Sequence, residues 1–196
     1  ALAAYLALAD CLVLEAARLD SRLDFTVAAD PSWSVRLDRW LEARLSELLV
    51  AGDSTLRAEM DAAVRQRSAR AVEASGDGLR QFLSLYGFHP AVNLARLPCA
   101  QQSLERGELL NAELQLSQLL DSPDPATAGR ATALLAKVYT RAGREQLAVD
   151  CYKRLAENWP DVVCDEGRTG RQLCDAAHAQ EPLRAAWESQ SSWPWG

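Results

Sequence analysis

Residues 130–160 carry an apolar pattern that constrains the fold more than any other part of the chain. Apolar side chains recur three, four and seven residues apart on both sides of Gly143, which is the spacing of one face of an α-helix. A proline pushes the preceding residue out of the helical region, so Pro160 should end the second run. The pattern predicts two helices folded back on each other across Gly143. Their apolar positions are Leu134, Leu135, Val138, Tyr139, Leu147, Ala148, Cys151, Tyr152 and Leu155.

The same segment matches the spacing of the tetratricopeptide type of helical hairpin, which repeats about every 34 residues. Leu135 and Tyr139 stand at the characteristic positions of its first helix. Ala148 and Tyr152 stand at those of its second helix, and Pro160 takes the place of its closing proline. The leading tryptophan of the repeat is absent. We expect Ala148 to lie where the helices approach each other most closely.

Parts of this pattern recur upstream. The spacing of Gly143, Ala148, Tyr152 and Leu155 recurs 36 residues earlier in Gly107, Ala112, Leu116 and Leu119. A shorter match before that is formed by Phe82, Leu85 and Pro90. Three copies predict stacked helical hairpins, a short all-α solenoid over residues 1–180. The predicted seam positions are Gly107, Ala112, Leu116, Leu135, Tyr139, Gly143, Ala148, Tyr152, Leu155 and Pro160.

The composition agrees with an all-α fold. Hydrophobic residues make up 48% of the 196 residues, and good helix formers dominate. Isoleucine is absent, and the period-two alternation of strands is rare. The net charge of −6, with charges of both signs on every predicted helix, argues against a nucleic-acid partner.

Caps and breakers place the other helices. Asp30 followed by Pro31 is a strong helix start, since an aspartate N-cap precedes proline at the first helical position. Pro98 should bend or split the helix that contains it. The expected helices are residues 1–19, Asp30 to Gly52, Asp53 to Ala74, Asp77 to Tyr86, Pro90 to Arg106, Glu108 to Leu120, Gly170 to Ala179 and Pro182 to Glu188, with an extended segment at Val162 to Cys164.

The five cysteines form no disulfide framework, because their number is odd and their spacing irregular, and the redox compartment stays open. Three of them should behave as small apolar side chains on helix faces. One set of four residues contains possible zinc ligands, but its spacing matches no usual zinc module. We therefore expect buried thiols and no metal or cofactor. The apolar cysteines are Cys11, Cys99 and Cys151, and the four-residue set is Cys151, Cys164, Cys174 and His178.

No residue pattern indicates a catalyst. We expect His89, beside a proline, to be a solvated turn residue. Asp165 and Glu166 are adjacent, so their carboxylates should point apart. The loop from Gly167 to Gly170 lacks the glycine spacing and the lysine of a phosphate-binding loop and should be a plain turn. The chain is therefore predicted not to be an enzyme.

The two ends of the chain suggest a segment of a longer protein. Residues 1–9 are apolar but too few to span a bilayer, and no charged signal-peptide start precedes them. The final residues, 181–196, form a predicted tail that contains Trp187, Trp193 and Trp195. These tryptophans could belong to a tail docked on the helices. We expect them instead to form an interface that anchors a neighbouring domain, because tryptophan is enriched at interfaces.

The chain resembles the helical region of large bacterial proteins, typical of planctomycete-like bacteria, that combine helices with PQQ-binding-like β-propeller repeats. The runs LRQFLSLYGFHPAVNLAR and AVDCYKRLAENWPDV, the SPDPA turn, the GRTG loop and the WPWG end carry the resemblance, which covers most of the chain from Trp40 onward. It implies a propeller after the tail. It also implies an architecture like that of membrane-coat scaffolds, with no quinone-binding residue in this chain.

Three functions are compatible with these patterns. The first is a non-enzymatic scaffold whose partners are a propeller in the same polypeptide or other proteins, with peripheral membrane association through the full-length protein. The second is an adaptor that binds an extended peptide in its groove. The third is an accessory domain of a quinone-dependent enzyme. Few polar inner-face positions, such as Asn111 and Lys137, are recognisable, so we expect the scaffold.

Overall fold

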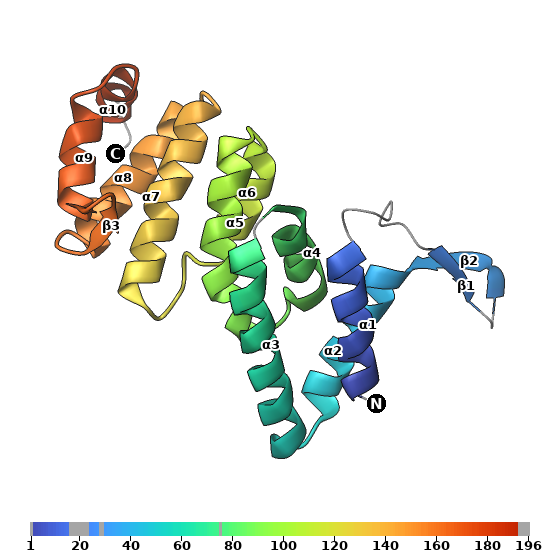
Figure 1. Cartoon of the computed structure of the whole chain (residues 1–196). Coiled ribbons are helices and arrows are strands. Elements are labelled where there is room, and N and C mark those ends of the chain that lie inside the picture. Colours follow the sequence, from blue (N-terminus) through green and yellow to red (C-terminus); the bar gives the residue numbers. More distant parts are fainter. Residues whose placement is uncertain (1, 16–23, 28–29, 75, 192–196) are drawn as a thin grey trace. The chain divides into compact units, whose positions relative to one another are not determined.

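The chain folds into helices joined by short connections, with two small β-hairpins (Figure 1). This computed structural model describes residues 2–15, 24–27, 30–74 and 76–191. Helices account for most of these residues, and the strands there form only two-stranded sheets, which confirms the all-α class. The elements are α1 (Leu2–Glu15), β1 (Asp24–Val27), β2 (Asp30–Arg36), α2 (Leu37–Ala51), α3 (Ser54–Ala74), α4 (Gly76–Tyr86), the 3₁₀ helix η1 (Pro90–Val92), α5 (Asn93–Glu105), α6 (Leu109–Ser117), α7 (Pro125–Arg141), α8 (Glu145–Asn158), β3 (Val163–Asp165), β4 (Arg168–Thr169), α9 (Gly170–His178) and α10 (Leu183–Ser191).

The chain divides into two compact units, Ala1–Cys99 and Ala100–Gly196. In the first unit, α4 packs against α1, α2 and α3. In the second unit, α7 packs against α6 and α8, and α8 packs against α9 and α10. Each unit has its own buried apolar side chains. Within the described part of the chain, no helix combines the length and the apolar character needed to cross a membrane.

The predicted helix start at Asp30 is wrong. Residues 30–36 form β2, which pairs antiparallel with β1, with Phe25 opposite Val35 and Thr26 opposite Ser34. The aspartate–proline signal is local, whereas the Ser-Trp-Ser-Val run after it contains no strong helix former and favours pairing with Phe-Thr-Val. Helix α2 therefore begins only at Leu37 and ends before Gly52, as expected.

Pro98 does not split its helix. After the 3₁₀ turn at Pro90–Val92, α5 runs without a break from Asn93 to Glu105, with Pro98 inside it. A proline in a helix leaves the carbonyl four residues earlier without its donor. Here that carbonyl belongs to Leu94, a residue that is 77% exposed.

The turns after α5 and α7 have the same backbone geometry. Gly107 and Gly143 both have positive φ, 77° and 66°. In each turn the glycine N–H bonds a carbonyl three residues back, and the next N–H bonds one five residues back, which defines a Schellman motif. The bonds are Gly107 N to Leu104 O (3.0 Å), Glu108 N to Ser103 O (2.8 Å), Gly143 N to Thr140 O (3.2 Å) and Arg144 N to Tyr139 O (2.9 Å).

The residues at matching positions after these two turns are also buried alike. Ala112 and Ala148 are both 0% exposed, as are Leu119 and Leu155. The upstream copy differs: Phe82 and Leu85 are buried, but the position that corresponds to the alanine is Gly78, where an added Cβ would meet nothing within 4 Å. Close alanine packing is therefore present in two of the three predicted copies. Leu116 is buried beside Ala112 in α6, Leu135 is buried in α7, and Pro160 follows α8.

Candidate functional site

A cavity of about 340 Å³ in the second unit is the best candidate for a binding site. Its walls come from α7, α8, the β3–β4 hairpin, α9 and the residues that lead into α10. Both apolar and polar side chains line it, and the charged ones come from α7 and the hairpin. The lining residues are Ala133, Lys137, Thr140, Arg141, Tyr152, Asp165, Arg168, Leu173, Ala176, Ala177, Gln180 and Leu183.

Local sequence signals build the walls of this cavity. Asp124 caps α7 by accepting hydrogen bonds from Ala126 N and Thr127 N. Pro125 occupies the first turn, where a backbone N–H would have no partner within the helix, so its missing N–H costs no hydrogen bond. The β3–β4 turn uses Glu166 and Gly167, both with positive φ, to reverse the chain. Thr169 and Gln172 form a capping box that begins α9 directly after the hairpin. The hairpin is thereby fixed between α7 and α9.

Asp165 links two cations in the cavity. Its Oδ1 accepts from Lys137 Nζ at 2.8 Å, and its Oδ2 accepts from Arg168 Nη2 at 3.1 Å. The Asp165 side chain is only 18% exposed, so these charge-assisted bonds are partly shielded from water. Arg141, the third lining cation, donates from Nη1 to Leu104 O at 2.6 Å. The lining thus contains one carboxylate and three cations, which leaves a local surplus of positive charge.

Hydroxyl groups complete the polar lining. Burial raises the pKa of Tyr152, whose hydroxyl interacts with the Thr140 side chain. Thr140 Oγ1 in turn donates to Ala136 O at 2.8 Å. Tyr139, another predicted seam residue, donates its hydroxyl hydrogen to Glu113 Oε1 at 2.9 Å, and burial together with this carboxylate raises its pKa to about 12. Both tyrosines therefore stay protonated at neutral pH.

The candidate zinc ligands do not come together. Cys164 is buried, and its thiol donates to Val162 O at 3.2 Å. Cys151 and Cys174 are partly buried, and burial is the main cause that raises the pKa of each of the three thiols, to about 11 for Cys151. His178 instead packs edge-to-face on Trp187, with ring centres 5.0 Å apart. Among the described residues, no group of three or more His, Cys, Asp or Glu side chains could hold a metal ion.

His89 is not the solvated residue that the sequence predicted. It is 3% exposed, and its Nδ1 accepts a hydrogen bond from Ala91 N at 3.1 Å, so it caps η1. Its Nε2 lies 4.0 Å from Asp61 Oδ1. Desolvation lowers the pKa of His89 more than this carboxylate raises it. Of the three cysteines expected on apolar faces, Cys99 is buried and Cys151 half-buried, whereas Cys11 is exposed.

Trp187 lies in α10, partly buried against the apolar cluster around Ala148, with Lys153 Nζ 5.3 Å from the ring centre. These contacts lie within the second unit, and the role of Trp187 at an interface with another domain stays a prediction. Trp193 and Trp195 lie outside the described residues.

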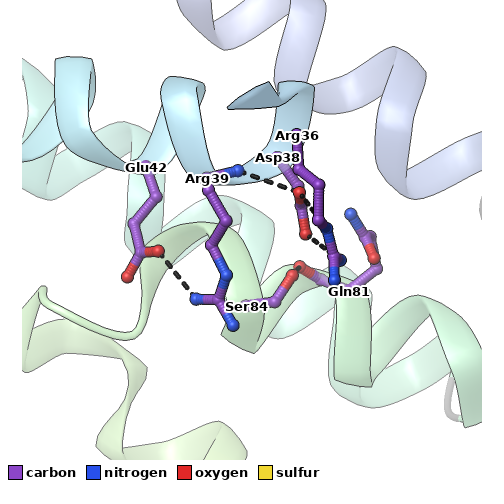
Figure 2. Close-up of polar contacts among 6 residues, drawn as sticks. All are labelled: Arg36, Asp38, Arg39, Glu42, Gln81 and Ser84. Atoms are coloured by element: carbon purple, nitrogen blue, oxygen red, sulfur yellow. Dashed lines mark hydrogen bonds and ion pairs between the residues drawn. The ribbon is translucent and has the colours of Figure 1, made fainter. Parts of the chain in front are cut away.

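A second polar cluster, at the start of α2, stabilises the fold. Figure 2 shows Arg36 and Asp38 beside Gln81 and Ser84 of α4. Asp38 is 3% exposed and accepts from Arg36 Nε at 3.1 Å, Arg36 Nη2 at 2.7 Å and Arg39 N at 2.9 Å. A buried carboxylate must be paired in this way, so these bonds offset the burial of Asp38.

Sequence reasoning named Lys137 as an inner-face residue but missed the site around it. Asp165 was considered only together with its neighbour Glu166. The Glu166–Gly167 turn is a local signal that could have placed Asp165 beside Arg168. The contact with Lys137 joins residues 28 positions apart and leaves no local signal.

Comparisons with protein-family models, with curated proteins and with solved structures gave no match.

Proposed function

We propose that this chain is a non-enzymatic protein-interaction module, an α-solenoid of stacked tetratricopeptide-like hairpins within a larger scaffold protein. The repeated turn geometry supports this proposal. The Schellman motifs at Gly107 and Gly143 lie 36 residues apart, and each precedes a fully buried alanine, Ala112 or Ala148, at the same spacing. Helical hairpins that repeat in this way stack on their neighbours and expose extended surfaces, which such proteins use to bind partners.

The resemblance noted in the sequence suggests the larger context. There the partner is a β-propeller in the same polypeptide, and the whole protein resembles a membrane coat. Fold analogy alone does not establish function, so the gene must be examined. The full-length gene should encode propeller repeats next to this segment. Cross-linking of its purified product should then join this segment to a propeller segment of the same polypeptide, and flanking sequence without propeller repeats would refute the scaffold model.

An accessory role in a quinone-dependent enzyme makes a different prediction. In that case the full-length product oxidises a substrate with bound quinone, and deleting the helical segment lowers this activity. In the scaffold role the deletion leaves any such activity of the propeller unchanged and removes only the cross-linked partners. The two outcomes distinguish the roles in one preparation.

The cavity in the second unit favours a second candidate, the peptide-binding adaptor. Lys137, Arg141 and Arg168 give it a positive lining within a chain of net charge −6. A carboxylate side chain or chain end of a partner would gain charge-assisted hydrogen bonds there. The expected ligand is therefore an acidic peptide, held partly by cations and partly by the apolar walls of α9.

Fluorescence anisotropy with labelled penta-glutamate and penta-glutamine peptides tests this candidate. The acidic peptide should bind more tightly, and added salt should weaken it, because screening reduces the attraction between exposed charges. Arg168→Gln should weaken binding about tenfold, the effect of losing one hydrogen bond to a charged group. The matched control is Arg144→Gln, since Arg144 is exposed and does not line the cavity. Equal binding of both peptides would exclude the candidate.

A further inference from the structure

A second cavity, of about 290 Å³, lies within the first unit and does not depend on the function proposed above. It is formed by α1, α3 and α4, and Phe82, Val13, Ala71 and Ala74 supply apolar wall. Its volume is near the lower end of the range for small-molecule sites, about 300–1,000 Å³. Its lining residues are Asp10, Val13, Arg67, Arg70, Ala71, Ala74, Gly78, Phe82 and Tyr86.

One lining residue, Tyr86, has a buried hydroxyl whose hydrogen bonding is not satisfied by the described residues. Tyr86 is 1% exposed, and within the described part of the chain its hydroxyl oxygen has no partner. Buried polar groups are almost always hydrogen-bonded, so such an atom calls for an explanation. Burial raises the pKa of Tyr86 to about 12, so at neutral pH the hydroxyl is protonated and can donate to an acceptor. A ligand that brings an acceptor would satisfy it.

The charges around the cavity indicate which acceptor fits. Arg67 donates from Nε and Nη2 to the two carboxylate oxygens of Asp10, both at 2.7 Å, so this pair is neutral overall. Arg67 lines the same cavity as Tyr86 and interacts with it electrostatically. Arg70 adds a second guanidinium to the lining, where Asp10 is the one carboxylate. The lining therefore carries a surplus positive charge beside a hydrogen-bond donor.

We propose that this cavity binds a small monocarboxylate with an apolar body, such as a short-chain or aromatic acid. The carboxylate accepts a hydrogen bond from the Tyr86 hydroxyl and is attracted by the guanidiniums of Arg67 and Arg70. The apolar body packs against Phe82 and Val13, which removes apolar surface from water. A neutral molecule of the same size gains the burial but not the charge interaction, so the site discriminates between an acid and its alcohol.

Isothermal titration of the whole chain with hexanoate and with 1-hexanol tests this assignment. Hexanoate should bind at millimolar concentration or below, and hexanol about tenfold more weakly, since it cannot form a charge-assisted hydrogen bond. Tyr86→Phe keeps the ring and removes only the unpaired hydroxyl, so it should fold normally and weaken hexanoate about tenfold. Arg70→Gln should weaken hexanoate but leave hexanol unchanged.

A blocking variant provides the control for location. Gly78 lines the cavity, and a Cβ added there meets no atom within 4 Å, so a larger side chain can be introduced without overlap. Gly78→Leu should therefore abolish hexanoate binding while far-ultraviolet dichroism stays helical. Failure of hexanoate to bind, equal affinity for hexanol, or unchanged binding by either Tyr86→Phe or Gly78→Leu would each overturn the proposal.

Discussion

His89 makes the stability of the first unit depend on pH. Desolvation lowers its pKa in the folded chain below the ordinary value of about 6.5, even though Asp61 opposes this shift and Arg65 adds to it. As the pH falls, the unfolded chain therefore takes up the proton first. The stabilisation by neutral His89 is fully present above about pH 6.5 and is lost as the pH falls toward the folded-state pKa.

The measurement is urea unfolding between pH 7.5 and 5.5, compared with the variant His89→Asn. Asparagine can also cap a turn but does not titrate, so the variant should lose less stability over this range. A wild-type chain whose stability changes no more than that of the variant would contradict the role of His89. Carboxylates titrate at lower pH and contribute similarly to both proteins.

Gly143 and Gly78 should respond in opposite directions to the same substitution. Gly143 has φ of 66°, a conformation that costs other residues about 1–2 kcal/mol, so Gly143→Ala should destabilise the chain by about that amount. Gly78 lies inside α4 with open space around it, and alanine favours helix by up to about 1 kcal/mol. Thermal unfolding should show a lower midpoint for the first variant and a raised midpoint for the second. A similar change in both would argue against the left-handed turn.

At the scale of single residues, the geometry of turns was easier to predict from the sequence than the burial of side chains. Gly143 and Gly107 were correctly placed in turns, because few residues other than glycine tolerate positive φ. His89 was misplaced, because its burial depends on α3, which is distant in sequence. The unpaired hydroxyl of Tyr86 has the same origin: side chains from several helices surround it, and no local pattern encodes them.

At the scale of elements, Ala148 should tolerate no larger side chain. It is 0% exposed and packs in one cluster with Val149, Ala177 and Leu183. Ala148→Leu overfills this space and should reduce the free energy of unfolding by about 1–3 kcal/mol. The control is Glu157→Leu on the same helix, where the side chain is exposed and the change should fall within about 0.5 kcal/mol. Chemical denaturation measures both, and equal effects would contradict the helix packing.

Elements were predictable where their signals were local and consistent. The end of α8 before Pro160 agrees with expectation, and Asp124 and Pro125 begin α7 by the same kind of local signal, since caps and prolines act within one turn of helix. The helix start predicted at Asp30–Pro31 was wrong, because strand pairing between β1 and β2 outweighed the local capping signal. The expected split at Pro98 is absent, and the residue four positions earlier, Leu94, is 77% exposed, whereas a bend in α5 stays a prediction.

At the scale of the whole molecule, the class of fold could be predicted, whereas the binding cavities could not. Helical periodicity is spread over the entire chain, so single errors at β2 or α5 do not change the all-α outcome. The cavity around Lys137 forms where α7, the β3–β4 hairpin and α9 come together in space. Such convergence depends on how the helices pack, and helix periodicity specifies only which face of each helix is buried.

The two compact units provide the final prediction, because each contains a buried cysteine side chain. Cys99 and Cys164 are both 3% exposed, the first within the core of the first unit and the second within the cluster around Leu155. Replacing a buried leucine by alanine destabilises a core by about 2–5 kcal/mol and increases local opening. Leu155→Ala should therefore accelerate alkylation of Cys164 much more than that of Cys99, and Leu85→Ala should do the reverse. Mass spectrometry of the alkylated chain at low urea measures both rates. If either substitution accelerated both thiols equally, the chain would open as one cooperative whole rather than as two units.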